Sequence, residues 1–172
     1  MDHGDHVDLI RDGITGSAWG DFGAGGGAFT LALAEVLGPS GSIYAIDRDA
    51  GALRANARAM RERFPLLRVQ YDEADFTSAL ALPELDGIVM ANSLHFQRDA
   101  GAVVRHVRGY LKPGGRIVIV EYNIERGNWA VPHPVAYSAW QRLAASAGFD
   151  HTELLARRPS RFLKEIYSAV SW

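Results

Sequence analysis

A cluster of glycines near the start of the chain is the segment best suited to chemistry. It reads Asp21-Phe22-Gly23-Ala24-Gly25-Gly26-Gly27-Ala28. Glycine lets the backbone turn sharply and lets a ligand approach closely, and three consecutive glycines cost backbone entropy that a turn alone would not require. A helix that begins after such a turn also presents free N–H groups and a partial positive charge. The cluster therefore predicts a ligand-binding loop.

The spacing of these glycines fits two kinds of ligand. Gly23-x-Gly25-x-Gly27 is the shorter pattern, and Gly23-x-Gly25-x-x-Ala28 satisfies the dinucleotide fingerprint, which tolerates alanine at its third position. Asp47 follows Gly27 by twenty residues and could hold ribose hydroxyls in either case, although it could also cap a helix. Together these residues indicate an adenosine-type ligand without saying which one.

Asp21 discriminates between such ligands by its charge. The two negative charges of a pyrophosphate would be repelled by this carboxylate, whereas an ammonium and a sulfonium would be attracted. S-adenosylmethionine carries both of these cations. Asp21 therefore favours S-adenosylmethionine over a dinucleotide.

The elements that must position this loop are predicted from hydrophobic periodicity. Apolar runs predict strands at 17–22, 42–47, 67–71, 85–91 and 116–122, and helical patterns occupy 29–37, 49–63, 103–111 and 134–147. Alternating strands and helices predict a parallel sheet covered on both faces. The run Ile117-Val118-Ile119-Val120 has no polar alternation, as expected of a strand buried on both sides.

The end of the chain changes this pattern. Two extended stretches, 151–156 and 162–172, are separated by a gap too short for a crossover helix, so they predict an antiparallel hairpin. We expect one α/β domain over residues 17–172, with a doubly wound, seven-stranded, mainly parallel sheet that ends in an antiparallel C-terminal hairpin. Residues 1–16 are polar and are expected to be disordered or to form one short helix.

Composition excludes several classes of function. The chain has 172 residues, which fits one domain, and 18 basic against 20 acidic residues, which gives no general attraction to nucleic acid. It has no cysteine, so thiolate chemistry is excluded, and no apolar run of the ~20 residues that a membrane span needs. The polar start of the chain is unlike a signal peptide, and we expect a cytoplasmic location.

In its motifs the chain resembles the class I (Rossmann-like) S-adenosylmethionine-dependent methyltransferases, from about Ser17 to the C-terminus. The segments that carry this resemblance occur in the family's order at the ends of the predicted strands. They are 21–27, Asp47 with Arg48, 74–76, 91–95 and 111–115. Each motif alone is weak, whereas the ordered set is fairly specific.

The resemblance implies S-adenosylmethionine as cofactor and direct displacement at its sulfonium methyl group. In the family the glycine loop passes the methionine part, an acid such as Asp47 takes the ribose hydroxyls, and an acid such as Asp75 accepts the adenine amino group. Asp75 could instead cap a helix that begins near Phe76. The cofactor-binding residues implied are Asp21, Gly23, Ala24, Gly25, Gly27, Asp47, Arg48, Asp75, Phe76, Asn92, Ser93 and Leu94.

His95 is the candidate catalytic residue, because an imidazole could take a proton from a hydroxyl nucleophile. The alternative is a histidine that hydrogen-bonds a loop carbonyl. We expect the substrate near Tyr122, Trp129 and His133, since the irregular connection from Asn123 to Pro134 leaves the sheet's binding edge. Packing explains Tyr122 nearly as well.

Two other functions stay open from the sequence. A nicotinamide-dependent oxidoreductase is disfavoured by Asp21 and by the lack of a recognisable Tyr-x-x-x-Lys pair. A non-catalytic S-adenosylmethionine-binding module in a larger assembly is also compatible with the short N-terminus, which lacks the lid helices common in the family. No Asn-Pro-Pro-Tyr type motif follows the fourth strand, which argues against nucleobase methylation. We expect a small-molecule acceptor, no nucleic acid, membrane or metal partner, and leave room for a homodimer.

Overall fold

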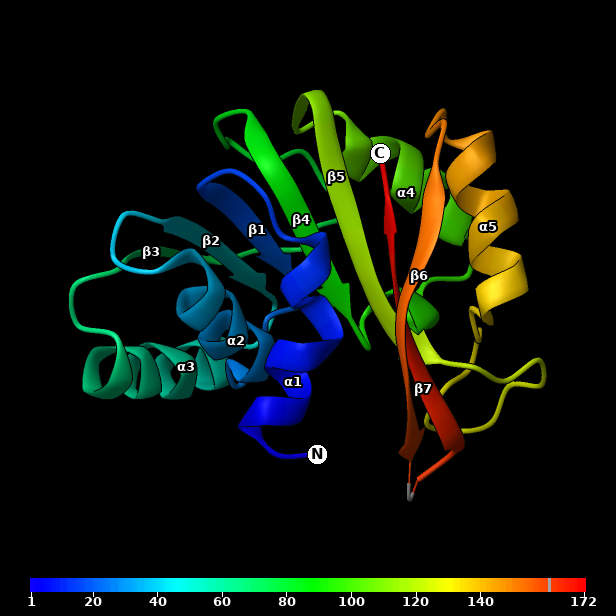
Figure 1. The fold of residues 1–172 in the computed structure, drawn as a ribbon, viewed down its shortest axis with the longest axis horizontal. Coiled ribbons are helices and arrows are strands. Elements are labelled where there is room, and N and C mark those ends of the chain that lie inside the picture. Colours follow the sequence, from blue (N-terminus) through cyan, green and yellow to red (C-terminus); the bar gives the residue numbers. More distant parts are fainter. Residues whose placement is uncertain (161) are drawn as a thin grey trace.

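One seven-stranded sheet organises the chain. The computed structural model describes residues 1–160 and 162–172, and its strands lie in the order β3-β2-β1-β4-β5-β7-β6 (Figure 1). They are β1 (Ala18–Phe22), β2 (Ser42–Asp47), β3 (Arg68–Glu73), β4 (Leu85–Ala91), β5 (Leu111–Tyr122), β6 (Thr152–Ser160) and β7 (Lys164–Ser171). β1 to β5 pair in parallel, and β7 pairs antiparallel with both β5 and β6. The predicted fold class is confirmed.

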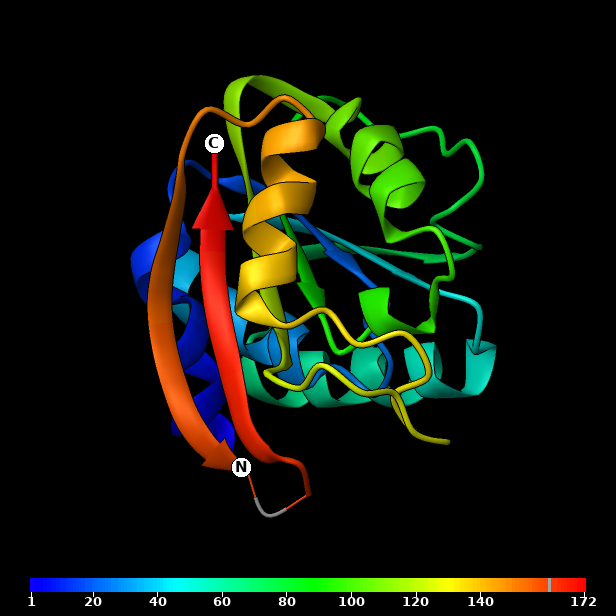
Figure 2. The same cartoon turned by 90° about the vertical axis from the view of Figure 1, so that its right-hand side faces the viewer.

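Helices cover both faces of this sheet. They are α1 (His3–Ile10), α2 (Ala28–Leu37), α3 (Ala50–Arg63), α4 (Ala100–Arg108) and α5 (Tyr137–Ser146), with short 3-10 helices at Arg11–Gly13 and Leu94–Phe96. In Figure 2 the helices α4 and α5 lie on one side of the sheet and α1 lies on the other. The layers are those of a doubly wound α/β fold.

The strand β5 shows how the sheet serves two cores. Val118 and Val120 pack in the cluster that holds residues of α1, α2 and α3. Ile117 and Ile119 pack in the opposite cluster, with Trp140 of α5. Because successive side chains of a strand point to opposite faces, an unbroken apolar run fits a strand with helices on both sides.

Two connections differ from the sequence prediction. α4 ends at Arg108, whereas the helix was predicted to continue to residue 111. Leu111 instead begins β5 and pairs with Leu85 of β4. The helix that we considered near Phe76 is absent from the described residues between β3 and β4. Asp75 there accepts hydrogen bonds from the backbone N–H and the hydroxyl of Thr77, which closes a turn instead of a helix.

The N-terminal segment forms the short helix that was one of its two predicted states. A capping box starts α1: the carboxylate of Asp2 accepts from the N–H of Asp5, and the carboxylate of Asp5 accepts from the N–H of Asp2. Its residues Val7, Leu9 and Ile10 are buried in the core. Among the described residues, no helix is both long and apolar enough to cross a membrane.

The strand order reverses between β1 and β4. From β1 the chain goes to β2 and β3 on one side, and it then returns to β4 and β5 on the other. In open α/β sheets such a reversal leaves a crevice at the carboxyl ends of the strands, where ligands bind. This edge of the sheet therefore positions the candidate site.

Candidate active site

A cavity lies at the carboxyl ends of β1, β2 and β4. It holds about 510 Å³ of empty space, counting the part open to solvent. Its lining residues come from the segments that follow these strands and β3. They are Gly23, Asp47, Arg48, Phe76, Asn92, Ser93, Phe96 and Gln97. Six of these eight were predicted from the sequence, and Phe96 and Gln97 were not.

The glycine loop, residues 23–27, is hydrogen-bonded to the end of β2. The N–H groups of Gly23 and Ala24 both donate to the carbonyl of Ile46, at 2.8 and 3.0 Å. At Gly23 φ is +84°, and a Cβ there would collide with the side chain of Ser93. At Gly27 φ is +94°, and a Cβ would lie 2.5 Å from Cγ of Asn56. Both positions therefore require glycine, for conformation and for space.

Asp47 joins this loop to the next helix. Its Oδ2 accepts from the N–H of Gly25 at 2.8 Å, and its Oδ1 accepts from the N–H of Asp49 at 2.8 Å. The N-cap of α3 is Asp49, so the alternative that Asp47 only caps a helix is not the observed arrangement. Each carboxylate oxygen has a further lone pair, so Asp47 can still accept hydrogen bonds from hydroxyls in the cavity.

Asp21 points into the protein toward α2. Its Oδ2 accepts a hydrogen bond from the Thr30 hydroxyl, which in turn accepts from the Nδ2 of Asn56. Asp21 is 1% exposed, and this burial raises the pKa of its carboxyl to about 7. The preference for S-adenosylmethionine over a dinucleotide requires a full negative charge on Asp21. At neutral pH burial leaves this carboxyl only partly ionised, so Asp21 discriminates less between the two ligands than its residue type predicts.

Arg48 and Asp75 face each other across the β2 and β3 ends. Nη1 of Arg48 lies 3.7 Å from Oδ2 of Asp75, and both side chains are open to solvent. The hydrogen bonds from Thr77 lower the pKa of Asp75, so this carboxylate stays ionised at neutral pH. Phe76 is buried and lines the cavity between them, where its ring offers an apolar surface to a flat group.

The segment after β4 brings polar atoms to the cavity wall. Asn92 has φ +51°, and its Oδ1 is buried without a hydrogen-bond partner among the described residues. The Ser93 hydroxyl donates to the carbonyl of Phe22 at 2.8 Å. Leu94 does not line this cavity, because its side chain is packed in the core. An unpaired buried acceptor is costly, so Asn92 fits a ligand that donates a hydrogen bond.

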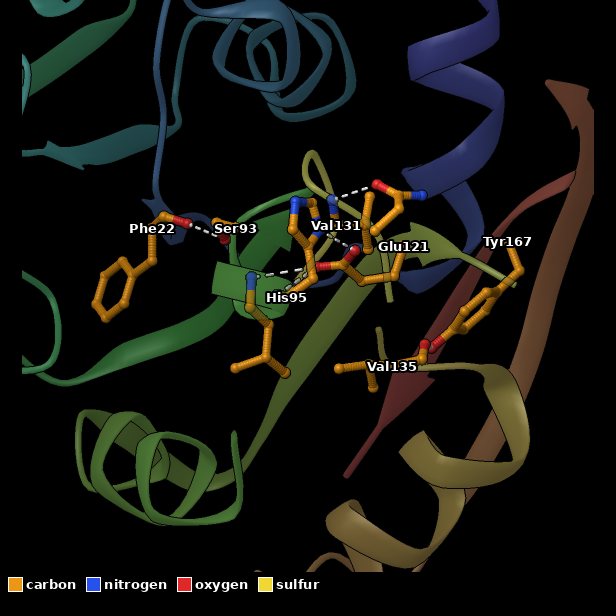
Figure 3. Close-up of polar contacts among 9 residues, drawn as sticks. Phe22, Ser93, His95, Glu121, Val131, Val135 and Tyr167 are labelled. Atoms are coloured by element: carbon orange, nitrogen blue, oxygen red, sulfur yellow. Dashed lines mark hydrogen bonds and ion pairs between the residues drawn. The ribbon is translucent and has the colours of Figure 1, made fainter. Parts of the chain in front are cut away.

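His95 and Glu121 form a buried pair beside this wall. Nδ1 of His95 lies 2.6 Å from Oε2 of Glu121, and the two side chains are 3% and 0% exposed (Figure 3). Oε1 of Glu121 accepts the N–H groups of Leu94 and His95. A carboxylate can only accept, so Nδ1 carries the proton and Nε2 keeps a free lone pair. No partner of Nε2 occurs among the described residues, so the imidazole can act as a base.

The predicted substrate residues are spread around this pair. The ring of Tyr122 lies 6.3 Å from that of His95, measured between centroids. His133 is exposed, and its N–H donates to the carbonyl of His95 at 3.0 Å. Trp129 is 91% exposed on the loop after β5. The structure therefore places Tyr122 next to the candidate base, whereas Trp129 stands in solvent.

The sequence carries a signal that Glu121 has a partner. A carboxylate at the end of an otherwise apolar strand must find a partner, because a buried unpaired charge is very costly. The adjacent strand β4 leads directly to His95, and neighbouring parallel strands bring their carboxyl ends together. Phe96 and Gln97 simply extend the predicted segment 91–95 by two residues.

These residues fit the adenosyl cofactor expected from the sequence. Asp47 offers carboxylate oxygens, Phe76 offers a flat apolar face, and Asn92 offers a buried acceptor without a partner. Of the other predicted residues, Gly25 and Gly27 shape the loop, and Asp75 lies beside Arg48. Ala24 is buried against Ala45 and Leu53.

Comparisons with known proteins agree with this geometry. A family model described as a methyltransferase domain matches residues 21–117. The chain is 27% identical over 161 residues to a reducing polyketide synthase, grgA, from Penicillium, which covers 78% of this chain and 6% of that protein. It is 29% identical over 105 residues to the ubiquinone/menaquinone biosynthesis C-methyltransferase UbiE of Pasteurella multocida, which covers 60% of this chain and 39% of that protein.

A solved structure shares the fold. Human N-acetylserotonin methyltransferase in complex with S-adenosylmethionine superposes with a TM-score of 0.67 at 17% identity, covering 99% of this chain and 56% of that one. The matched segments cover only 6% of the polyketide synthase and 39% of the C-methyltransferase, so the chain spans less than half the length of either relative.

Proposed function

The chain belongs to the methyltransferase domain family, and from this premise we propose that it transfers a methyl group to a small molecule. The cofactor is S-adenosylmethionine, which supplies an electrophilic methyl group on a positively charged sulfur. The observation that carries the proposal is the buried pair of His95 and Glu121, in which His95 lies in the chain between the cavity residues Ser93 and Phe96. Binding of the cofactor alone does not require a base, whereas methyl transfer to an acceptor that must lose a proton does.

The cavity residues would hold the cofactor in defined roles. Asp47 would accept hydrogen bonds from the ribose hydroxyls, and Arg48 with Phe76 would flank the adenine. Oδ1 of Asn92 would accept a hydrogen bond from a cofactor donor near the end of β4. These assignments follow from the lining residues and their open hydrogen-bonding positions.

The pair would serve an acceptor that must lose a proton. Nε2 of His95 would take that proton, and the Glu121 carboxylate would stabilise the imidazolium that forms. A neutral amine needs no base before it attacks, because its nitrogen already has a free lone pair, and a thiol ionises near neutral pH with little help. The pair therefore favours a weakly acidic oxygen or carbon, such as a phenol or a carbon between two carbonyls. The names of the relatives, a polyketide synthase and a C-methyltransferase, agree with the carbon acceptor.

Two measurements test this proposal. Titration calorimetry with S-adenosylhomocysteine tests the cofactor, and NAD serves as the competing ligand. Transfer of a labelled methyl group to a panel of phenols and 1,3-dicarbonyl compounds tests the reaction. With any acceptor that the wild type methylates, His95→Asn is expected to lower kcat by roughly 100-fold or more and to leave cofactor affinity unchanged. Tight binding of NAD alone, or full activity of His95→Asn, contradicts the proposal.

Two further properties complete the proposal. A cytoplasmic location and a homodimer are predictions from the sequence and from the resemblance. Light scattering on a size-exclusion column tests the oligomeric state, and fractionation of the source cells tests the location.

A further inference from the structure

One edge of the sheet carries backbone groups that the fold does not use. β3 is the outermost strand on its side of the sheet and pairs with β2 (Figure 1). The N–H of Ala74 donates to the carbonyl of Asp47, and the register pairs Asp47 with Glu73. Because successive residues of a strand direct their N–H and C=O groups to opposite sides, those of Val69, Tyr71 and Glu73 point away from β2. Among the described residues these outward groups have no partner.

The two edges of the sheet differ in their protection. β3 reads Arg-Val-Gln-Tyr-Asp-Glu, without proline or lysine, and its register with β2 is continuous from Arg68 to Glu73. The other edge strand, β6, contains Pro159 and an irregularity in its pairing with β7, and its Arg158 lies 3.4 Å from Asp8 of α1. Prolines, bulges and covering elements prevent an edge from pairing with another chain. β6 is therefore guarded, whereas β3 is open to a further strand.

A stripe of arginines flanks the open edge. Arg54, Arg58 and Arg61 recur at helical spacing, so they share one side of α3, and all three are exposed. Asn56 lies on the opposite side of α3 and donates a hydrogen bond to α2, so this arginine stripe faces away from α2 and toward the edge. Burial raises the pKa of the Tyr71 hydroxyl on β3 to about 12, and the nearby charge of Arg61 partly opposes that rise.

The arginine stripe is a local concentration of positive charge. Within the part of the chain that the structure describes, none of its three guanidinium groups forms an ion pair. The chain as a whole has a net charge of −2, so the stripe does not belong to a generally basic surface. A partner that matches both the stripe and the open edge carries negative charge and has an extended backbone.

We propose that β3 is a docking edge for an extended, acidic segment of another protein, which adds a strand to the sheet beside the arginine stripe. Val69 and Tyr71 pack on the same side of the sheet as Leu53 of α3. Residues directly opposite each other on antiparallel strands share a face, so partner residues opposite these two point toward the stripe. Acidic side chains suit those positions. In such strand addition, main-chain hydrogen bonds supply affinity and alternate side chains supply specificity.

Two other occupants fit this edge less well. A second copy of the chain, paired through β3 about a two-fold axis, would bring two arginine stripes together on one face of the joined sheet. A nucleic acid would neutralise the arginines, but its phosphates cannot donate to the outward carbonyls of β3. They would also lie beside the carboxylates of Asp72 and Glu73.

A short labelled peptide tests the docking edge by fluorescence anisotropy. The probe is Thr-Thr-Glu-Thr-Glu-Thr-Glu, capped at both ends, so that antiparallel pairing places glutamates opposite Val69 and Tyr71 and a threonine opposite Glu73. Its Kd is expected to rise with salt. N-methylation of the glutamates removes the N–H groups that face β3 and keeps every charge, and should raise the Kd about tenfold or more. A peptide with lysine in place of glutamate should not bind.

Variants of the protein locate the binding surface. Arg58→Glu should raise the Kd for the probe about threefold to tenfold, since it reverses one charge of the stripe. Val69→Pro removes an outward N–H and leaves the bonds to β2 in place, so it should also raise the Kd at least threefold. Arg142→Glu makes the same charge change on an exposed position of α5 and should have no effect. Thermal unfolding shows whether each variant is folded.

The inference does not depend on the proposed function and can fail separately. Equal affinity for the N-methylated and the unmodified peptide overturns it, because charge alone then explains binding. Undetectable binding at millimolar peptide overturns it as well, as does an unchanged Kd in Arg58→Glu. Tighter binding of single-stranded DNA of similar length would assign the arginine stripe to nucleic acid. A dimer of the wild type that Val69→Pro dissociates would assign the edge to a second copy.

Discussion

Nδ1 of His95 donates to Oε2 of Glu121 across 2.6 Å, although 26 residues separate the two in the chain. The three hydrogen bonds that Glu121 accepts hold both the ring and the backbone of the segment after β4. One carboxylate thus determines which nitrogen of the imidazole can accept a proton.

Glu121→Gln tests this relationship. The amide oxygen can keep the two backbone bonds, and its NH₂ group then faces Nδ1, so the proton moves to Nε2 and the base is lost. We expect kcat to fall by roughly a thousandfold while the affinity for S-adenosylhomocysteine is unchanged. Nitrogen-15 NMR of the histidine ring gives a readout that needs no acceptor. An unaltered His95 tautomer in the variant would contradict the assignment.

Asp47→Ala tests the link between the glycine loop and β2. The substitution removes the acceptor of the Gly25 and Asp49 N–H groups and the oxygens available to the cofactor. We expect the Kd for S-adenosylhomocysteine to rise by about 10-fold to 100-fold, since hydrogen bonds to charged groups contribute about 1.5–3 kcal/mol. Asp72→Ala is the matched control, because Asp72 accepts from the Gln70 side chain on β3. Equal losses in both variants would point to a general effect on the sheet.

Asp21→Asn tests the buried carboxyl through pH. Burial raises its pKa in the folded chain to about 7, above the ordinary value of 3.8 for this side chain, so the folded state holds the proton more tightly. Stability therefore falls as pH rises from about 4 to about 7 and then levels off. Without cofactor, the variant should have a higher melting temperature than the wild type at pH 8. Its free energy of unfolding should be larger by roughly 4 kcal/mol at most, and this difference should vanish near pH 4. A constant difference across pH would show that Asp21 does not titrate in this range.

Gly27→Ala tests the packing of the loop against α3. A Cβ at this position collides with the Asn56 side chain, and the alanine backbone must adopt a left-handed conformation. We therefore expect the free energy of unfolding to fall by about 2–4 kcal/mol. Gly26→Ala is the control, because no atom lies within 4 Å of its Cβ and its φ is not in the left-handed region. Thermal unfolding of both variants checks the difference. Similar melting temperatures would show that Asn56 moves aside at little cost.

Much of this fold was predictable because its signals are local. The run Ile117–Val120 predicts a strand buried on both faces, and the glycine cluster predicts a turn at the end of β1, without knowledge of other segments. The last hairpin was predictable because a short gap between two extended stretches excludes a crossover helix. The end of α4 was placed too far along the chain, because pairing with Leu85 draws Leu111 into β5. That contact exists only in the assembled sheet.

The candidate site was predictable in part. Residues at strand ends, such as Asp47 and Asn92, were located because parallel strands end at a common edge. The pairing of Glu121 with His95 was not predicted, because a carboxylate at the end of an apolar strand shows that a partner is needed but not which side chain on the neighbouring strand provides it.

The position of β7 has a consequence for synthesis on the ribosome. β7 is the last of these seven strands to be made, yet it lies inside the sheet, between β5 and β6. Until Lys164–Ser171 leave the exit tunnel, the backbone of β5 has an open edge and its neighbouring apolar side chains are uncovered. A nascent chain that still lacks β7 is thus kept from completing this core and is open to chaperones or to aggregation until that strand emerges.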